Sequence, residues 1–280
     1  MTIERARRPG PSVRTRVVEH KGHDEDAAEI AREDRLVTEE PLEIRVRVRG
    51  LEPRRAWVTM RTPGHDFELA AGWLVNEGLA TPGSLDQVAY CTDADLDPEQ
   101  EFNVVTVTLG AGAAEVPHRH AAASAGSSAC GVCGKDSVTE ALQVRSAAPW
   151  SGERPDADVV RRLPEALREH QDLFARTGGV HAAGLATAAG ELLVVREDVG
   201  RHNAVDKVVG ARVLAGDSPA AACLVLSGRV GFELVQKAAA SGIGSIVAVG
   251  APTSLAARLA GEAGIALWGF TSPGRSVNYC

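Results

Sequence analysis

Several features are scarce in this sequence, and each absence excludes a class of protein. Aromatic residues make up only 4% of the chain, so we expect cores rich in Val, Leu and Ala. No apolar run is as long as a membrane span, and the Arg- and Glu-rich start has no apolar block of the kind found in secretion signals. We therefore expect a cytosolic protein without a membrane partner.

Cysteines are few and their number is odd. The chain has five, and Cys91, Cys223 and Cys280 are scattered, so the pattern is not that of a disulfide framework. Neither a Walker loop nor a G-x-G-x-x-G motif occurs, which leaves the ordinary ATP and NAD binding modes without support. The net charge of -7 argues against nucleic acid as the main partner.

The length and composition indicate a globular protein. A chain of 280 residues, 44% hydrophobic and 24% charged, can bury one large core or two moderate ones. We expect a charge-dense, flexible tail over residues 1–34, a smaller N-terminal β/α subdomain over 35–150 and a C-terminal α/β domain over 151–280. In the N-terminal subdomain the patterns predict strands at 42–48, 56–60, 87–91 and 103–109, with a helix that Pro63 opens and Gly78 ends.

The C-terminal half alternates between helices and apolar strands. A helix is predicted from Pro164 to Arg176, then a hairpin of strands 180–187 and 192–196. Three helix–strand units follow: 203–214 with 223–226, 232–240 with 245–249, and 254–263 with 265–270. This alternation predicts a largely parallel sheet covered by helices on both faces.

The most reactive pattern is Cys130-Gly-Val-Cys133, which closes a stretch without apolar periodicity, residues 110–134. Such a stretch is typical of a functional loop or of disorder, and we expect a mobile loop over residues 110–134. The two thiols are compatible with half of a zinc site, with a redox disulfide, or with a thiolate that carries another group. His118 and His120 would complete a zinc site, whereas the context of a thioredoxin-like dithiol is missing.

A helix is predicted directly after the two cysteines. Ser137-Val-Thr-Glu140 is a capping box for a helix that runs through Val144. The dipole of this helix, together with Lys135, would favour a thiolate at Cys133.

Polar residues follow four of the predicted C-terminal strands. They are Glu197–Asn203, Ser227–Arg229, Gly250–Ser254 and Thr271–Arg275. The carboxyl ends of parallel strands share one edge of a sheet, where ligands bind, and the helix N-termini at that edge offer N–H groups to anions. Arg201, Arg229 and Arg275 add planar donors that match phosphate. The pattern predicts a ligand that carries phosphate groups.

One segment partly matches a zinc deaminase motif. Gly179-Val-His181-Ala-Ala183 has the histidine of a His-x-Glu motif, but Ala183 stands where the glutamate should be. The cysteine pair also precedes this histidine, whereas in deaminases it follows. Deamination is therefore not expected.

Five segments of the chain form a recognisable set: Cys130-Gly-Val-Cys133-Gly134, Thr177-Gly-Gly-Val-His181-Ala-Ala, Glu197-Asp-Val-Gly-Arg-His-Asn-Ala-Val-Asp-Lys207, Ser227-Gly-Arg229 with Glu233, Gln236 and Lys237, and Gly269-Phe-Thr-Ser-Pro-Gly-Arg275. Together they resemble the formate dehydrogenase accessory sulfurtransferase family (FdhD), and the resemblance extends over nearly the whole chain after the tail. One departure is Gly228, where relatives often have serine.

The resemblance implies a sulfurtransferase that takes sulfur from a cysteine desulfurase as a persulfide and passes it to Mo-bis(molybdopterin guanine dinucleotide). Formate dehydrogenase or a related molybdoenzyme would then receive the sulfurated cofactor. It also implies a homodimer and a three-layer α/β C-terminal domain that is cytidine-deaminase-like without the zinc site.

The site residues follow from both sources. The resemblance places the persulfide on Cys130, although the predicted helix favours Cys133 as thiolate, so we assign Cys130 with Cys133 as its partner. The resemblance assigns the cofactor segment Phe270, Thr271, Ser272, Pro273, Gly274 and Arg275, to which the polar strand ends add Arg229, His202 and Arg201. No metal of the protein's own is expected. The alternative is a non-catalytic nucleotide-binding scaffold with a structural zinc at the cysteine loop.

Overall fold

A computed structural model describes residues 8–22, 28–91, 101–110 and 147–280 of the chain. The strands are β1 (Ser12–Lys21), β2 (Ala28–Val37), β3 (Glu40–Val48), β4 (Arg54–Arg61), β5 (Leu85–Tyr90), β6 (Val104–Leu109), β7 (His181–Ala186), β8 (Leu192–Asp198), β9 (Cys223–Leu226), β10 (Ser245–Ala248), β11 (Ala266–Ser272) and β12 (Arg275–Asn278). The helices are α1 (Asp66–Asn76), the short 3-10 helix η2 (Pro82–Ser84), α3 (Ala157–Glu169), α4 (Asp172–Thr177), α5 (Arg201–Leu214), α6 (Phe232–Ala240) and α7 (Ser254–Glu262).

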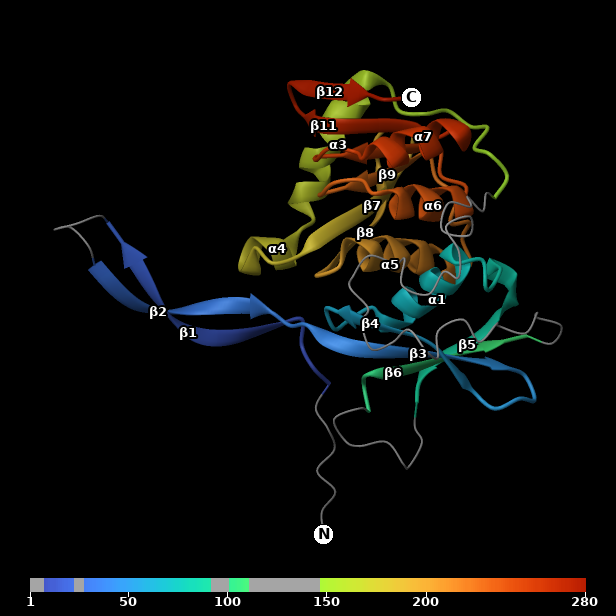
Figure 1. Cartoon of the computed structure of the whole chain (residues 1–280), viewed down its shortest axis with the longest axis horizontal. Helices are drawn as coiled ribbons and strands as arrows, with labels where there is room; N and C mark the ends of the chain where they lie inside the picture. Colours follow the sequence, from blue (N-terminus) through green and yellow to red (C-terminus); the bar gives the residue numbers. More distant parts are fainter. Residues whose placement is uncertain (1–7, 23–27, 92–100, 111–146) are drawn as a thin grey trace, which may run out of the picture.

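The C-terminal sheet has the strand order β12-β11-β10-β9-β7-β8 (Figure 1). Only β9, β10 and β11 are parallel neighbours, because β7 runs antiparallel to both β8 and β9, and β12 runs antiparallel to β11. The sheet is thus less parallel than the sequence predicts. Since β7 separates them, β8 still points the same way as β9, so the carboxyl ends of β8 to β11 do share one edge.

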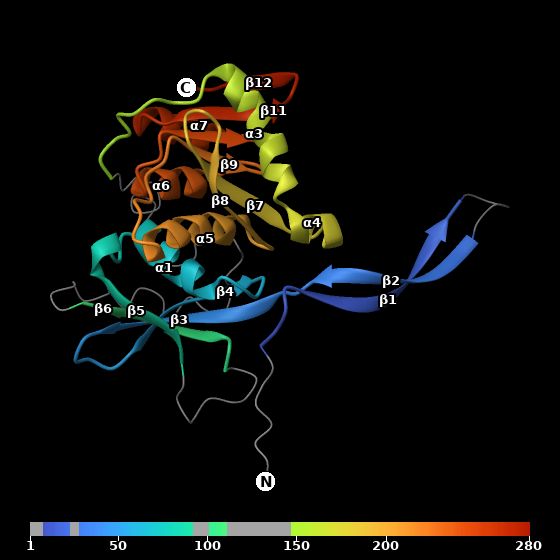
Figure 2. The same cartoon turned by 180° about the vertical axis from the view of Figure 1, so that it is seen from behind.

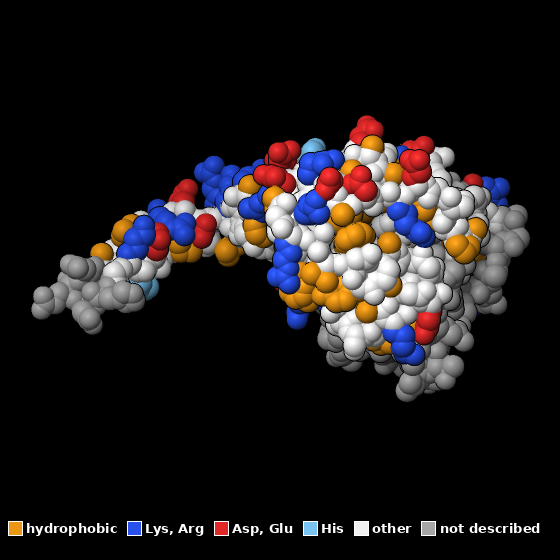
Figure 3. All heavy atoms as spheres, turned by 90° about the horizontal axis from the view of Figure 1, so that it is seen from above, with side chains coloured by type: hydrophobic (Ala, Val, Ile, Leu, Met, Phe, Trp, Pro, Cys, Tyr) orange, Lys and Arg blue, Asp and Glu red, His pale blue; other side chains and the backbone are white. Residues whose placement is uncertain are grey.

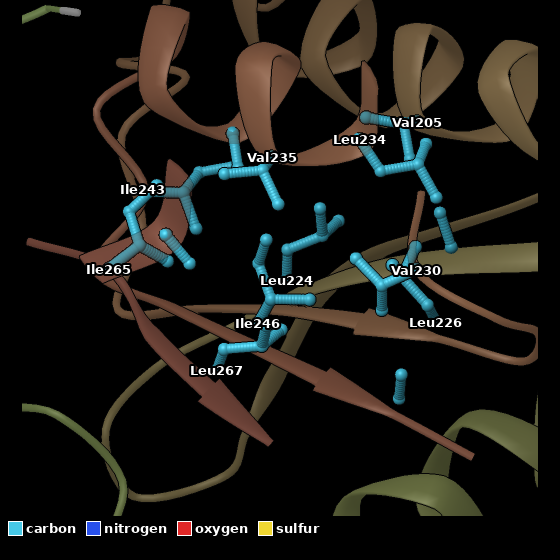
Figure 4. Close-up of a cluster of buried hydrophobic side chains, with 14 of the residues drawn as sticks. Val205, Leu224, Leu226, Val230, Leu234, Val235, Ile243, Ile246, Ile265 and Leu267 are labelled. Carbon is cyan, nitrogen blue, oxygen red and sulfur yellow. The ribbon is translucent and has the colours of Figure 1, made fainter. Parts of the chain in front are cut away.

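Helices cover both faces of this sheet. On one face α3 buries Val160, Leu163 and Leu167 against β7, β9 and β10. On the other, α5, α6 and α7 bury an apolar cluster that includes Val205 and Leu234 (Figure 4). The residues are mostly Val, Leu, Ile and Ala, as the low aromatic content predicts. The result is a mixed α/β arrangement of helix, sheet and helix layers.

The N-terminal sheet has the order β4-β3-β6-β5 and carries α1 on one face. Alternation along β3 buries Leu42, Ile44 and Val46, which pack with Leu69 and Leu74 of α1. Within this unit the stacked rings of Trp57 and Trp73 lie 4.9 Å apart, which adds to the apolar burial. The strands and the helix of this region are confirmed close to their predicted positions.

Helix α1 lies between the N-terminal sheet and α5, as both views of the molecule show (Figures 1 and 2). The two helices meet backbone to backbone at two glycines. A Cβ atom on Gly72 would lie 1.8 Å from the carbonyl oxygen of Asp206, and one on Gly210 would lie 1.8 Å from that of Glu68. Only glycine allows this approach.

The segment predicted as a flexible tail has regular structure where it is described. Strands β1 and β2 form an antiparallel hairpin, which we call the arm, in register from Ser12 opposite Val37 to Lys21 opposite Ala28. The low apolar content favours a tail, but oppositely charged side chains pair across the strands, for example Arg32 with Glu19 at 2.8 Å. Such cross-strand pairs support a hairpin.

The predicted helix from Pro164 to Arg176 is wrong in its start and its continuity. Helix α3 begins earlier, because the Asp156 carboxylate accepts hydrogen bonds from the backbone N–H groups of Asp158 and Val159. Pro164 lies inside α3, and the chain breaks between α3 and α4. Among the described residues no helix is long and apolar enough to cross a membrane.

We expect Gly72→Ala to lower the free energy of unfolding by about 1–3 kcal/mol, because the added methyl group forces α1 away from α5. The same change at an ordinary helix position stabilises by roughly 1 kcal/mol. Urea unfolding measures the difference, with Gly83→Ala as control, since a Cβ there meets no atom within 4 Å. Equal stability of wild type and Gly72→Ala would contradict the close crossing.

Candidate functional site

The candidate site is the edge of the C-terminal sheet at which β8, β9, β10 and β11 end. The residues that follow these strands come together there as predicted. Because β7 is antiparallel, its first residue, His181, also lies at this edge, opposite Asp198. His181 has no predicted role at this edge, and only the reversed direction of β7 places it in the site.

Much of the polar segment after β8 is used inside the protein. Asp198 is fully buried and accepts hydrogen bonds from the backbone N–H of Thr62 and from the side chain of Asn203. Lys207 lies 2.6 Å from the same carboxylate and donates to the carbonyl oxygen of Thr62. Asn203 donates to the carbonyl oxygen of Met60. These residues hold the end of β4 against α5 and are not available to a ligand.

A second buried ion pair lies beside the helix crossing. Lys237 of α6 contacts both carboxylate oxygens of Asp206, at 2.9 and 3.0 Å, and Asn76 of α1 donates to Asp206 at 2.7 Å. Burial raises the pKa of Asp206 to about 6 despite the neighbouring ammonium group. Attraction to Asp206 and Glu77 outweighs the desolvation of Lys237 and raises its pKa. This pair joins α1, α5 and α6.

Arg201 and His202, two predicted ligand-binding residues, lie at the start of α5 and have different surroundings. The Nε atom of Arg201 is buried and has no hydrogen-bond partner in the described part of the chain. Burial lowers the pKa of the neighbouring His181, and the charge of Arg201 lowers it further, against a smaller opposing effect of Asp198. His202 is only 8% exposed, and its Nε2 lies 3.9 Å from a carboxylate oxygen of Glu233.

The first turns of α6 and α5 offer different surroundings to an anion. The Glu233 carboxylate lies over the start of α6, where a Cβ on Gly231 would be 2.7 Å from it. The first turn of α5 contains no acidic residue, and no side chain caps its N-terminus. An anion is therefore better accommodated at α5, beside Arg201, than at α6.

Arg229 follows β9 and is exposed. The chain packs tightly around it, since Gly250 donates its N–H to the carbonyl oxygen of Gly228 and a Cβ on Gly250 would lie 2.9 Å from Cγ of Arg229. The first carbons of the Arg229 side chain are thus held by the neighbouring chain, while the residue as a whole remains exposed.

The predicted cofactor segment forms the β11–β12 turn. Phe270 has a positive φ of 48°, unusual for a residue with a side chain, and its N–H bonds to the carbonyl oxygen of Gly250. In this conformation Phe270 is 41% exposed, and the Arg275 guanidinium lies 5.1 Å from the centre of its ring. Thr271 is buried, and its hydroxyl has no hydrogen-bond partner among the described residues. Ser272, Pro273 and Gly274 are exposed.

The two cysteines of the predicted reactive pair, Cys130 and Cys133, lie outside the described residues, as do His118 and His120. The assignment of the persulfide and the alternative zinc site therefore stay predictions. Within the described ranges no group of three or more His, Cys, Asp or Glu side chains is placed to hold a metal ion.

Known proteins similar to this chain match most of its length. The model of the FdhD/NarQ family matches residues 37–280. A protein named sulfur carrier protein FdhD from Streptomyces coelicolor is 46% identical over 264 residues, covering 90% of this chain and 89% of its own. Proteins of the same name from Streptomyces avermitilis and Thermoplasma volcanium are 45% and 37% identical, covering 90% and 84% of this chain and 89% and 83% of their own.

A solved structure has a similar fold. The crystal structure of a protein from Desulfotalea psychrophila, assigned as a formate dehydrogenase accessory protein, superposes with a TM-score of 0.71 and covers 96% of both chains. Its sequence identity is 23%, so this similarity concerns the fold.

Some residues of the edge hold the protein together and others face a ligand. Substitutions in the two groups should therefore change the free energy of unfolding by very different amounts. Lys207→Met should lower the free energy of unfolding by about 3–5 kcal/mol, because it leaves the Asp198 carboxylate buried without its cation. Arg229→Met should change it by less than about 0.5 kcal/mol, because this side chain is exposed. Denaturant unfolding compares the two, and a Lys207→Met protein as stable as wild type would show that Asp198 does not need its partner.

Proposed function

Because the chain belongs to the FdhD/NarQ family, we propose that it is a sulfur carrier that serves formate dehydrogenase or a related molybdoenzyme. It accepts sulfur from a cysteine desulfurase as a persulfide and passes it to Mo-bis(molybdopterin guanine dinucleotide), its substrate. We propose that it acts in the cytoplasm as a homodimer. The proposal is carried by one observation: the cysteine pair and the donor-rich sheet edge both lie within the residues that the family model matches.

The cysteine pair supplies the sulfur chemistry of this proposal. The Cys130 thiolate attacks the outer sulfur of the desulfurase persulfide, which releases the desulfurase thiolate and leaves a persulfide on Cys130. For delivery, the Cys133 thiolate attacks Sγ of Cys130, so that the outer sulfur leaves as hydrosulfide and a Cys130–Cys133 disulfide forms. The two cysteine thiolates provide the two electrons that reduce the transferred sulfur. A dithiol reductant then reopens the disulfide for the next cycle.

The sheet edge supplies the binding part. The cofactor carries phosphate groups and two guanines, which call for charged donors and an apolar surface. Arg201 and Arg275 provide forked donors, and the exposed ring of Phe270 provides a surface on which a base can stack. The unpaired hydroxyl of Thr271 is a further donor. We also propose that the C-terminal domain is cytidine-deaminase-like in its fold. Because Ala183 stands where a deaminase has its glutamate, the proposal includes no deaminase activity.

We expect Cys130→Ala to abolish sulfur transfer without unfolding the protein. Intact-mass measurement after incubation with a cysteine desulfurase and cysteine should show one added sulfur on wild type and none on Cys130→Ala. The control is Cys280→Ala, which removes an exposed thiol elsewhere in the chain and should load normally. Equal loading of Cys130→Ala, with full activation of the client enzyme, would overturn the assignment of the persulfide to Cys130.

We expect Arg275→Ala to weaken binding of guanosine diphosphate, a fragment of the cofactor, by about ten- to a hundredfold, since one charge-assisted contact contributes roughly 1.5–3 kcal/mol. Arg275→Lys should recover only part of the loss, because an ammonium group cannot make the paired contact. Calorimetry measures the affinities, and Arg258→Ala, an exposed arginine on α7, is the matched control. Unchanged affinity in Arg275→Ala would remove this turn from the binding site, while sulfur loading on Cys130 tests the carrier role separately.

A further inference from the structure

Arg201, the first residue of α5, carries a charge that no described residue balances. Its guanidinium group makes no hydrogen bond or ion pair with the described part of the chain, although its Nε atom is buried. A buried donor that belongs to a charged group is costly when it has no acceptor. The residue as a whole is only partly buried, so a ligand can reach it. A bound anion would supply the acceptor and remove this cost.

Three carboxylates lie near the start of α5, and each of them has another partner. Glu197 accepts hydrogen bonds from the first N–H groups of α4. Asp198 pairs with Lys207 at 2.6 Å. The Glu233 carboxylate lies over the start of α6, where a Cβ on the preceding glycine but one would be 2.7 Å from it. The described structure therefore supplies no carboxylate to Arg201.

His181 is the neighbour of Arg201 at this end of the edge. The charge of Arg201 is one of the causes, after burial, that lower the pKa of His181, which places the guanidinium group close to the imidazole. Gly228 borders the same ring, since a Cβ there would lie 3.3 Å from its Nδ1 atom. A lowered pKa favours the uncharged imidazole, which still has one N–H to donate. Arg201 and His181 can therefore both donate to one anion.

The start of α5 adds to this preference. No side chain caps its N-terminus, and its first turn contains no acidic residue. Ala204 is the first residue whose N–H bonds inside the helix, to the carbonyl oxygen of Gly200. The positive end of the helix dipole therefore acts together with the charge of Arg201, and both favour an anion.

Arg275, another predicted phosphate ligand, lies toward the opposite end of the edge. Helix α5 packs on β7 and β8, whereas Arg275 follows β11, and the strand order β11-β10-β9-β7-β8 separates them. At about 4.8 Å per strand, the two arginines start from backbone positions roughly 14–19 Å apart. Arg275 is also held at its own end, 5.1 Å from the centre of the Phe270 ring. A single phosphate group therefore does not serve both arginines.

The edge faces the side of the molecule from which the arm projects. The turn between β11 and β12 and the helix α4, which precedes β7, both lie on that side (Figures 1 and 2). Seen from above, this side of the body carries basic side chains next to hydrophobic ones (Figure 3). An extended ligand with charged groups at more than one place suits such a surface.

We propose that Arg201, together with His181 and the first turn of α5, binds an oxyanion separately from the group that Arg275 binds. We call these residues the Arg201 subsite. The inference rests on the proposed function and deepens it, because it gives the bound cofactor a direction along the edge. Its guanosine diphosphate part lies at Arg275, and a second oxyanion lies at Arg201. This second group is either the molybdenum with its oxygen ligands or the phosphates of the other nucleotide.

Calorimetry of the full chain at low ionic strength tests the Arg201 subsite, with inorganic phosphate and molybdate as probes. Guanosine diphosphate is kept saturating, so that the Arg275 end is occupied. One of the two probes should still bind, and Arg201→Met should weaken this binding about ten- to a hundredfold. Arg201→Lys should recover part of it. Tighter binding of molybdate identifies the metal end of the cofactor, and tighter binding of phosphate identifies the second nucleotide.

The matched control is Arg212→Met, which removes an arginine from the other end of α5, where it pairs with Asp217 at 2.8 Å. This control should bind both probes as wild type does. Arg201→Met should keep at least the free energy of unfolding of wild type without ligand, because it removes a cation that has no partner. A large loss of stability would make Arg201 a structural residue and overturn the proposal.

The pKa of His181 gives an independent measurement, read from its ring signal by NMR and assigned with His181→Gln. The bound probe should raise this pKa, because a nearby anion favours the imidazolium form. Arg201→Met should raise it without any probe, since a lowering charge is lost, and should abolish the further rise on adding the probe.

Unchanged affinity for both probes in Arg201→Met would overturn the proposal, and so would a wild-type chain that binds neither of them. An equal loss of guanosine diphosphate affinity in Arg201→Met and Arg275→Ala would show one shared site and also overturn it. Failure of the sulfur-carrier role is distinguished by mass measurement, because Arg201→Met should load sulfur on Cys130 as wild type does.

Discussion

The close contact between α1 and α5 is the constraint on which the rest of the structure depends. Gly72 and Gly210 let the two backbones touch, and the ion pairs Asp198–Lys207 and Asp206–Lys237 lie beside this contact. Charges buried in this way are costly unless each one is paired and hydrogen-bonded, which makes their geometry demanding. The N-terminal sheet, which packs on α1, is therefore placed against the C-terminal sheet by a small set of contacts.

This constraint also decides which polar residues are left for a ligand. The segment from Glu197 to Lys207 contains residues of both kinds. Glu197 accepts hydrogen bonds from the first N–H groups of α4, and Asp198, Asn203 and Lys207 hold the end of β4. Arg201, between them, retains a buried donor without a partner in the described part of the chain. Most polar residues of this segment therefore bind other parts of the protein and hold the N-terminal region against α5. Arg201 is the exception, because its buried Nε atom has no partner among the described residues.

The opposite end of the edge is shaped by backbone conformation. The register between β11 and β12 shifts between Gly269 and Ser272, and Phe270 adopts a left-handed conformation there. The shift turns the Phe270 ring outward beneath Arg275, while Thr271 stays buried. A conformation that costs roughly 1 kcal/mol or more is kept where surrounding contacts hold it, here the bond from Phe270 to Gly250. Strained positions of this kind are common at binding sites.

The sequence by itself determined the alternation of helices and strands, because apolar periodicity and glycine or proline boundaries are local signals. It also determined the family, through motifs such as Cys130-Gly-Val-Cys133, and the strand ends that meet at the candidate site. Only the tertiary structure decided which polar residues are internal. Lys207 and Arg201 are both cationic residues of the same polar segment, and they differ in whether a residue distant in sequence supplies a partner. It also decided the direction of β7, which brings His181 to the edge, and the pairing of β1 with β2, because cross-strand partners cannot be identified from a charged, weakly apolar segment alone.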